Sequence, residues 1–155
     1  MEAQLQQIKK LLDSSKIKYE LSEHEPVYTS EQAARVRGVP LSSGVKSIII
    51  KTEEGKFYCI LIPGDKKMNT KKLQSILHTK KISFAKPEEV LERTGCEIGS
   101  VHPFGNVMHL PTCMDRKLLE NETVNFNVGL HTHSIAMKSQ DLVKIVKPKL
   151  EDFST

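Results

Sequence analysis

One lysine stands inside an otherwise apolar stretch of this sequence. Lys46 lies within Gly-Val-Lys-Ser-Ile-Ile-Ile, residues 44–50, whose β-branched side chains are typical of a buried strand. A charged residue in such a strand either faces outward from a half-exposed surface or reaches into a pocket. In a pocket its ammonium group would supply a compact cation with three donors, suited to hydroxyl, carbonyl or phosphate oxygens. The strand pattern by itself leaves both positions open.

A second chemical feature is the segment Gly-Ser-Val-His-Pro-Phe-Gly-Asn, residues 99–106. Two glycines and a proline so close together predict a shaped loop between strands. Glycine lets the main chain approach a ligand and proline fixes the backbone, so the amides of Ser100, Val101 and His102 could face a developing oxyanion. An ordinary structural turn has the same composition and is the alternative for this segment.

Histidine and cysteine are the common zinc ligands, and the second half of the chain holds several of them. Their spacing matches no strong zinc pattern, and no His-Glu-x-x-His motif is present. Cys59 lies in an apolar, strand-like run, as does Cys113, and there a thiol acts as a small hydrophobic group rather than a nucleophile. A zinc hydrolase is one alternative, with the candidate ligands His102, His109, Cys113, His131 and His133.

Positive charge is concentrated in the first 80 residues, although the formal net charge is only +4. The densest part, residues 66–81, has six lysines and no acidic residue. Such a segment could neutralise nucleic-acid phosphates, and a solvated helix face is the equally weighted alternative. The candidate phosphate contacts are Lys66, Lys67, Lys71 and Lys72.

The elements that must hold these residues switch irregularly between helical and strand-like periodicity. Thr29 and Asn69 are expected N-caps, Ser139 is expected to cap the last helix, and Gly38 is expected to end the second. This order excludes a Rossmann fold or a (β/α)8 barrel and predicts a mixed α/β class. We predict helices over 3–14, 30–36, 70–77, 87–94 and 139–146, and strands over 18–24, 45–51, 56–64, 81–85, 107–113, 123–128 and 132–138, the second and third strands forming a hairpin.

Length and composition agree with an ordinary globular protein: 155 residues, 38% of them hydrophobic and 27% charged. We expect a single domain over residues 1–155. No apolar run suits a membrane-spanning helix, and the N-terminus lacks the pattern of a secretory signal. The three cysteines are scattered and form no C-x-x-C pair, which argues against disulfides. We therefore expect a cytoplasmic protein without a membrane partner.

Four segments, in the same order, resemble the YbaK/EbsC and prolyl-tRNA synthetase insertion (editing) domain family of aminoacyl-tRNA deacylases. They are HEPVYTSEQAA at 24–34, the strand lysine Lys46, the G-x-x-x-P loop Gly99–Pro103 followed by Phe104 and Gly105, and FNVGLHTHSIAMKSQDL at 126–142. The resemblance covers almost the whole chain. It implies a mixed, partly closed sheet flanked by helices, with a cleft between the Lys46 strand and the loop that would admit the 3′ end of a tRNA.

Members of that family hydrolyse the ester between an amino acid and the terminal adenosine of tRNA. The resemblance implies that Lys46 holds substrate oxygens, that the loop Gly99–Pro103 positions the carbonyl, and that a ribose hydroxyl assists, with no cofactor and no metal. It implies a trans-editing deacylase for a small amino acid of the cysteine or alanine type on tRNA(Pro), with an aminoacyl-tRNA synthetase as a further candidate partner. The implied substrate-binding residues are His24, Thr29, Ser47, Phe104, Gly105, Gly129, His131 and Ser134.

Two points stay open within this resemblance. His131 and His133 depart from the family pattern; on one strand they would face the same side, either lining the cleft or half-exposed. Gly129 replaces a bulkier residue of some alanine-directed relatives, which favours a cysteine preference. A non-catalytic tRNA-binding or regulatory module of the same fold is the alternative function, and the retained Lys46 and complete loop argue against it.

Overall fold

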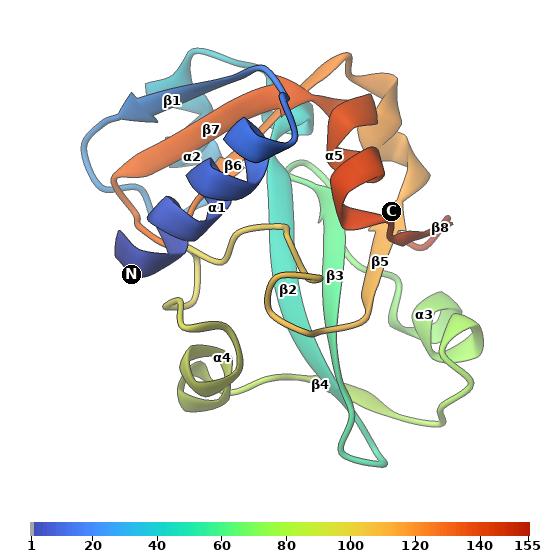
Figure 1. Cartoon of the computed structure of the whole chain (residues 1–155). Helices are drawn as coiled ribbons and strands as arrows, with labels where there is room; N and C mark the ends of the chain where they lie inside the picture. Colours follow the sequence, from blue (N-terminus) through green and yellow to red (C-terminus); the bar gives the residue numbers. More distant parts are fainter. Residues whose placement is uncertain (1) are drawn as a thin grey trace.

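The computed structural model describes residues 2–155 and confirms the mixed α/β class (Figure 1). The helices are α1 (Glu2–Ser14), α2 (Ser30–Arg37), α3 (Thr70–Ile76), α4 (Pro87–Thr94) and α5 (Ser139–Val146), with 3-10 helices η1 (Leu41–Ser43) and η2 (Arg116–Glu120). The strands are β1 (Tyr19–Glu23), β2 (Val45–Thr52), β3 (Phe57–Pro63), β4 (Ile82–Phe84), β5 (Thr112–Asp115), β6 (Thr123–Asn127), β7 (His133–Lys138) and β8 (Lys149–Glu151). In this described part of the chain, no helix is long and apolar enough to cross a membrane.

The strands form two sheets, where the resemblance implied one partly closed sheet. A five-stranded mixed sheet has the order β4-β2-β3-β5-β8, and a three-stranded antiparallel sheet has the order β1-β7-β6. The predicted hairpin is confirmed: β2 and β3 pair antiparallel, with Lys46 opposite Ile62. A single bridge between Gly44 and Asn125 joins the sheets. Because Lys46 follows Gly44 by two residues, this bridge brings the start of β2 close to β6.

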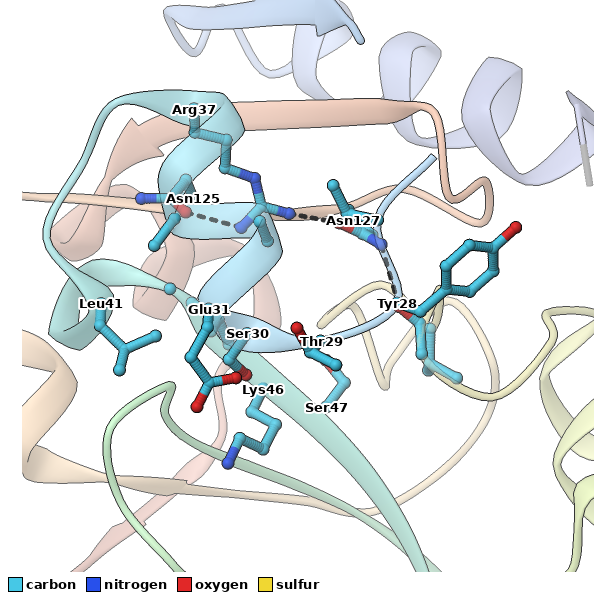
Figure 2. Close-up of a pocket in the computed structure, with 17 residues that line it drawn as sticks. Tyr28, Thr29, Ser30, Glu31, Arg37, Leu41, Lys46, Ser47, Asn125 and Asn127 are labelled. Carbon is cyan, nitrogen blue, oxygen red and sulfur yellow. Dashed lines mark hydrogen bonds between the residues drawn. The ribbon is translucent and has the colours of Figure 1, made fainter. Parts of the chain in front are cut away.

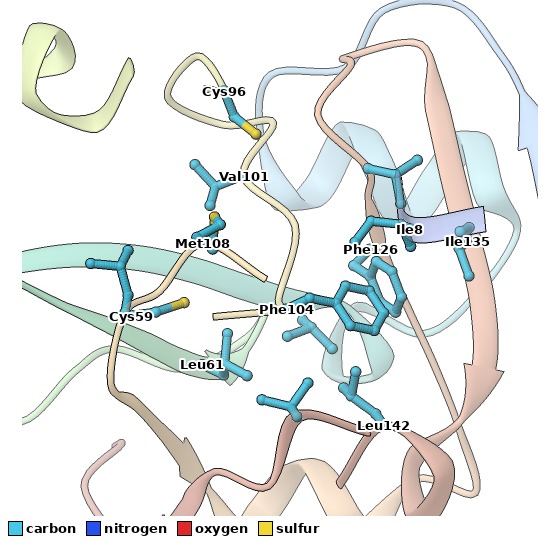
Figure 3. Packing of buried hydrophobic residues seen from close by; sticks show 14 of the residues in the cluster. Ile8, Cys59, Leu61, Cys96, Val101, Phe104, Met108, Phe126, Ile135 and Leu142 are labelled. Carbon is cyan, nitrogen blue, oxygen red and sulfur yellow. The ribbon is translucent and has the colours of Figure 1, made fainter. Parts of the chain in front are cut away.

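The larger hydrophobic core lies between the two sheets and is covered by α1 and α5 (Figures 1 and 3). Phe104 is fully buried in it and packs edge-on against Phe126, with 5.5 Å between ring centroids. The helical spacing of the apolar residues in α1 places Leu5, Ile8 and Leu12 on its buried face. A smaller core lies under α3, where Leu73 packs with residues of β2 and β3.

Three predicted helix caps agree with the structure and one does not. Asn69 caps α3 by accepting a 3.1 Å hydrogen bond from Lys72 N–H. Thr29 caps α2 by accepting a 3.1 Å hydrogen bond from Gln32 N–H, and Gly38 ends that helix in the left-handed region at φ 68°. The prediction that Ser139 caps α5 is wrong. Lys138 is the N-cap, and the Ser139 hydroxyl instead donates to the Asn121 carbonyl at 2.6 Å. The serine is engaged by a neighbouring segment, which local sequence does not reveal.

One strand prediction needs correction, and one strand was not predicted. The strand expected at 107–113 begins only at Thr112, because residues 105–109 turn tightly, with Leu110 N–H donating to Gly105 O at 2.9 Å. Strand β8 was not predicted; it exists because Lys149–Glu151 pairs in parallel with β5. Three-residue strands have almost no periodicity of their own, so pairing partners decide whether they form.

A buried carboxylate anchors the C-terminal segment. Asp115 accepts hydrogen bonds from the amides of Lys117, Phe153 and Ser154 at 2.8, 2.9 and 2.8 Å. The residues beyond it pair with the segment before α3, since Lys67 and Thr155 exchange two backbone hydrogen bonds. Asp115 therefore holds, through the C-terminus, the segment that leads into the lysine-rich helix α3.

Candidate active site

A cavity of about 330 Å³ lies where α2, the start of β2, the loop at 99–101 and β6 converge (Figure 2). Lys46, Gly99 and Val101 all line it. The bridge between Gly44 and Asn125 explains this convergence, because it places the β2 start against β6. The cleft implied by the resemblance, between the Lys46 strand and the loop, is therefore present. Of the other predicted substrate-binding residues, Thr29 and Ser47 line it as well.

Lys46 is half-buried at the edge of this cavity rather than on an open face of the sheet. Its ammonium group donates to the Lys66 carbonyl at 3.2 Å. No acidic side chain within residues 2–155 forms an ion pair with it. An ammonium group has three donors, so two N–H bonds stay open to a ligand. Next to it, Ser47 Oγ is buried and has no hydrogen-bond partner among the described residues.

Of the three amides expected to face an oxyanion, those of Ser100, Val101 and His102, one is left without an acceptor among residues 2–155. Ser100 N–H donates to Glu97 O at 3.0 Å, and His102 N–H is directed at the Cys96 sulfur. Val101 N–H has no acceptor within residues 2–155, and Val101 lines the cavity. The prediction for Ser100 and His102 as oxyanion donors is therefore wrong, because local turns consume their N–H groups. Val101 is the amide that remains available.

Gly99 shapes this loop through its backbone. Its φ of +86° lies in the left-handed region, and an added Cβ would sit 3.4 Å from His131 Cε1. The Gly99 carbonyl accepts a 2.9 Å hydrogen bond from Asn127 Nδ2. Asn127 thus ties the loop to β6, two residues before Val101.

The second half of the predicted loop belongs to the core. Pro103 and Phe104 are buried, and His102 is fully buried with its Nδ1 accepting from Phe104 N–H at 3.2 Å. Burial lowers the pKa of His102 to about 4, so its imidazole is neutral at pH 7. An added Cβ at Gly105 would overlap Thr112 Oγ1. His102, Pro103, Phe104 and Gly105 do not line the cavity, so they lie outside the expected site.

The predicted histidines separate in the structure. His131 lies in a turn before β7, so the expectation that it shares a strand face with His133 is wrong. Its ring packs against Tyr28 at 4.6 Å beside Gly99, whereas His133 Nε2 lies 3.8 Å from the Glu23 carboxylate on β1. His131 thus contacts two residues of the cavity lining without lining the cavity itself, and His133 does not line it either.

Three further predicted contacts lie outside the cavity lining. His24 Nε2 hydrogen-bonds Ser134 Oγ at 2.7 Å, and Ser134 is buried behind Arg37. Gly129 has φ 84° and donates to Ser100 O at 2.8 Å. A left-handed backbone accounts for glycine at this position, so its identity carries no information on the amino acid bound.

Arg37 is the main site residue that sequence reasoning missed. Its guanidinium lines the cavity and donates to Ser134 Oγ and Asn125 Oδ1, each at 2.8 Å, and to Asn127 Oδ1 (Figure 2). Burial lowers its pKa to about 10, so it stays charged at neutral pH. A signal was present in Thr-Val-Asn-Phe-Asn-Val, where two asparagines alternate with apolar residues and must share one strand face.

The predicted phosphate contacts, zinc ligands and cysteines lie outside the cavity lining. Lys67, Lys71 and Lys72 are exposed, whereas Lys66 is half-buried with its Nζ 3.9 Å from the Asp65 carboxylate. In residues 2–155, no three histidine, cysteine, aspartate or glutamate side chains gather into a metal-binding group, so the five proposed zinc ligands do not assemble. Burial raises the pKa of Cys59 to about 12 and also raises that of Cys113, as expected for inert core thiols.

The pocket and the two-sheet fold together define a class of protein: an aminoacyl-tRNA editing domain. The sequence profile of the aminoacyl-tRNA editing domain matches residues 24–145. The chain belongs to this family.

Relatives of similar length have names that agree with this membership. The chain is 28% identical over 147 residues to the multifunctional Ser/Thr-tRNA deacylase ProXp-y of Escherichia coli K12, covering 92% of this chain and 88% of that one. It is 29% identical over 141 residues to the prolyl-tRNA editing protein ProX of Acetoanaerobium sticklandii, with 88% and 86% covered. A proline–tRNA ligase of Bacillus licheniformis is 41% identical over 83 residues, 53% of this chain and 14% of the ligase.

Solved structures share the fold. The hypothetical protein APE2540 superposes with a TM-score of 0.86 at 26% identity, covering 96% of this chain and 99% of that one. A candidate trans-editing enzyme for prolyl-tRNA synthetase superposes with a TM-score of 0.84 at 24% identity, with 98% and 97% covered.

Proposed function

We propose that this chain is a trans-editing deacylase that hydrolyses the ester of a small amino acid wrongly attached to tRNA. The observation that carries the proposal is that Lys46, Gly99 and Val101, distant in sequence, line one cavity. Family membership supports an aminoacyl-tRNA ligand. Similarity to prolyl-tRNA editing proteins supports tRNA(Pro) as the tRNA.

The cavity supplies what ester hydrolysis needs. Lys46 holds oxygens of the substrate through its two open N–H bonds, and the Val101 amide stabilises the oxyanion that develops on the carbonyl. A water molecule, oriented by the ribose hydroxyl next to the ester, attacks the carbonyl carbon. The bond to the ribose oxygen then breaks, that oxygen takes a proton, and the amino acid leaves as a carboxylic acid. Holding the ester in place is itself a large part of the rate enhancement.

The polar lining of the cavity favours a hydroxyl-bearing amino acid. Thr29, Ser30 and Ser47 all line it, and the buried Ser47 hydroxyl has no partner among residues 2–155. An unpartnered buried hydroxyl is unfavourable until a ligand supplies the missing hydrogen bond. We therefore favour serine or threonine as the amino acid, in agreement with the name of the E. coli relative. The cysteine or alanine type expected from the sequence stays a prediction.

A panel of mischarged tRNAs tests this function. The substrates are tRNA(Pro) charged with serine, threonine, alanine or cysteine, and the same four amino acids on their cognate tRNAs. Each is mixed with the purified chain, with and without a chelator. Loss of the ester is followed by acid precipitation. We expect the serine or threonine ester on tRNA(Pro) to be cleared fastest, at a rate the chelator does not change. Hydrolysis of no ester above the buffer rate, with tRNA still bound, would instead favour the non-catalytic module.

The exposed lysines at α3 are proposed contacts for tRNA phosphates. Changing Lys71 and Lys72 together to glutamine should raise KM about tenfold and leave kcat unchanged, because phosphate contacts position the tRNA without touching the ester. The slope of log(kcat/KM) against log salt should fall by roughly 1.5. The matched control changes Lys9 and Lys10 on α1 to glutamine. Equal salt slopes in both double variants would make α3 an ordinary solvated helix face.

A further inference from the structure

Arg37 brings into the cavity a positive charge that forms no ion pair with any carboxylate of residues 2–155, including Glu31, which also lines the cavity. The three acceptors of its guanidinium, Ser134 Oγ, Asn125 Oδ1 and Asn127 Oδ1, are all uncharged. None of the ion pairs formed within residues 2–155 includes Arg37, although Arg116 pairs with Asp152 at 2.8 Å on the surface. Arg37 is half-buried, and partly removing a cation from water without an opposite charge is unfavourable. Its retention points to a partner that is not part of the protein.

The guanidinium has room and donors for such a partner. It carries five N–H bonds, of which the protein uses three. Beside it, Gly44 lines the cavity, and an added Cβ there would lie 3.9 Å from Arg37 Nη1. Gly44 has φ −75° and ψ 134°, a conformation open to any residue, so the backbone does not require glycine. Because residue 44 has no side chain, it does not cover this side of Arg37 at the cavity.

We propose that Arg37 forms an oxyanion site in the cavity, separate from Lys46, in which its open N–H groups bind a negatively charged oxygen of the ligand. The identity of that ligand rests on the proposed function. In an aminoacyl-tRNA the same chemistry has two sources, a backbone phosphate near the terminal adenosine and the oxyanion that develops on the ester carbonyl. Three fixed neutral acceptors hold the guanidinium in place before the ligand arrives, which lowers the cost of binding.

The competing interpretation is a purely structural Arg37 that ties α2 to β6 and β7. Asn125→Asp separates the two. The new carboxylate keeps the 2.8 Å contact with Nη1 and adds an ion pair, so a structural role is preserved, but the charge available to a ligand is neutralised. Asn125 Nδ2 also donates to Ser43 Oγ at 2.8 Å, a modest loss. Asn121→Asp is the matched control, since it makes the same chemical change outside the cavity lining.

We expect Asn125→Asp to unfold within a few degrees of the wild type and to lower kcat/KM for the best ester of the panel about 100-fold. A loss confined to kcat assigns the site to the ester oxyanion, and a rise in KM assigns it to a phosphate. Kinetics within threefold of the Asn121→Asp control would overturn the proposal.

A binding measurement tests the same site without relying on catalysis. In the wild-type chain, titration with inorganic phosphate should shift the Nε–H NMR resonance of Arg37, assigned with Arg37→Lys. This measurement decides the proposal if Asn125→Asp does not fold, or if the wild type hydrolyses no ester and the proposed function fails. A resonance that stays in place up to saturating phosphate would overturn the oxyanion site.

Discussion

Replacing Lys46 with alanine is expected to lower the single-turnover rate of deacylation by about two to three orders of magnitude. The side chain borders the cavity. Within residues 2–155 its ammonium group donates to the Lys66 carbonyl alone, which leaves two donors open to substrate oxygens. A donor that is already oriented loses no energy to reorganisation when charge develops on the ester. The measurement is single-turnover hydrolysis of the best mischarged tRNA from the panel, under saturating enzyme.

Lys51 provides a matched control on the same strand. Its ammonium group pairs with Glu89 at 3.0 Å and lies over the Phe57 ring, away from the cavity. Lys51→Ala should keep the wild-type rate and lose at most about 1 kcal/mol of folding free energy. Thermal unfolding of both variants checks that each is folded. A folded Lys46→Ala variant with near wild-type rate would remove Lys46 from the mechanism.

The largest expected effect on stability is that of Asp115→Asn. The carboxylate accepts hydrogen bonds from three backbone amides, and the substitution puts an NH2 group, which cannot accept, among these donors. Hydrogen bonds to a charged group contribute about 1.5–3 kcal/mol each. We expect a loss of about 3–4 kcal/mol, or a Tm roughly 10 °C lower. The control Asp152→Asn breaks only the exposed pair with Arg116 and should cost less than about 1 kcal/mol. Equal losses in the two variants would contradict the anchoring role.

The same carboxylate has a defined pH signature. Burial raises the pKa of Asp115, but the amide hydrogen bonds from Phe153 and Lys117 outweigh it, so the pKa lies below its ordinary 3.8. A lowered pKa in the folded state means that this stabilisation is fully present above pH 3.8 and is lost as the pH falls through the folded value. Urea unfolding between pH 2 and 6 should show the wild type losing stability below pH 4 more steeply than Asp115→Asn.

Asp115 also connects stability to the site. It holds Phe153 and Ser154, and the adjoining Thr155 pairs with Lys67. The residue before Lys67 is Lys66, whose carbonyl accepts the hydrogen bond from the Lys46 ammonium group. Loosening this anchor should therefore lower the deacylation rate as well, although less than removing Lys46 itself.

Local sequence determined most of the elements and the two segments that we propose carry the chemistry. The β2 and β3 hairpin, α4 and the caps of α2 and α3 follow from short-range patterns: β-branched runs, a proline at a first helical position, and Thr29, Asn69 and Gly38 at helix ends. Lys46 was identified because a charged side chain is unusual within an apolar strand. Such features depend on residues a few positions apart, which is the range over which a sequence can be interpreted directly.

Tertiary structure alone decided which of the candidate residues share a cavity. The Gly44–Asn125 bridge joins segments about 80 residues apart in the sequence and brings Arg37, Asn125 and Asn127 to Lys46 and Val101. It also sends Phe104 and His102 into the core, because packing the loop between the sheets leaves only Gly99 and Val101 of it on the cavity. Hydrogen bonds of Ser134 and Ser139 were set by distant neighbours in the same way. Long-range pairing and burial have no local signature, so the unpaired Val101 amide and the place of Arg37 in the cavity became visible only in the folded chain.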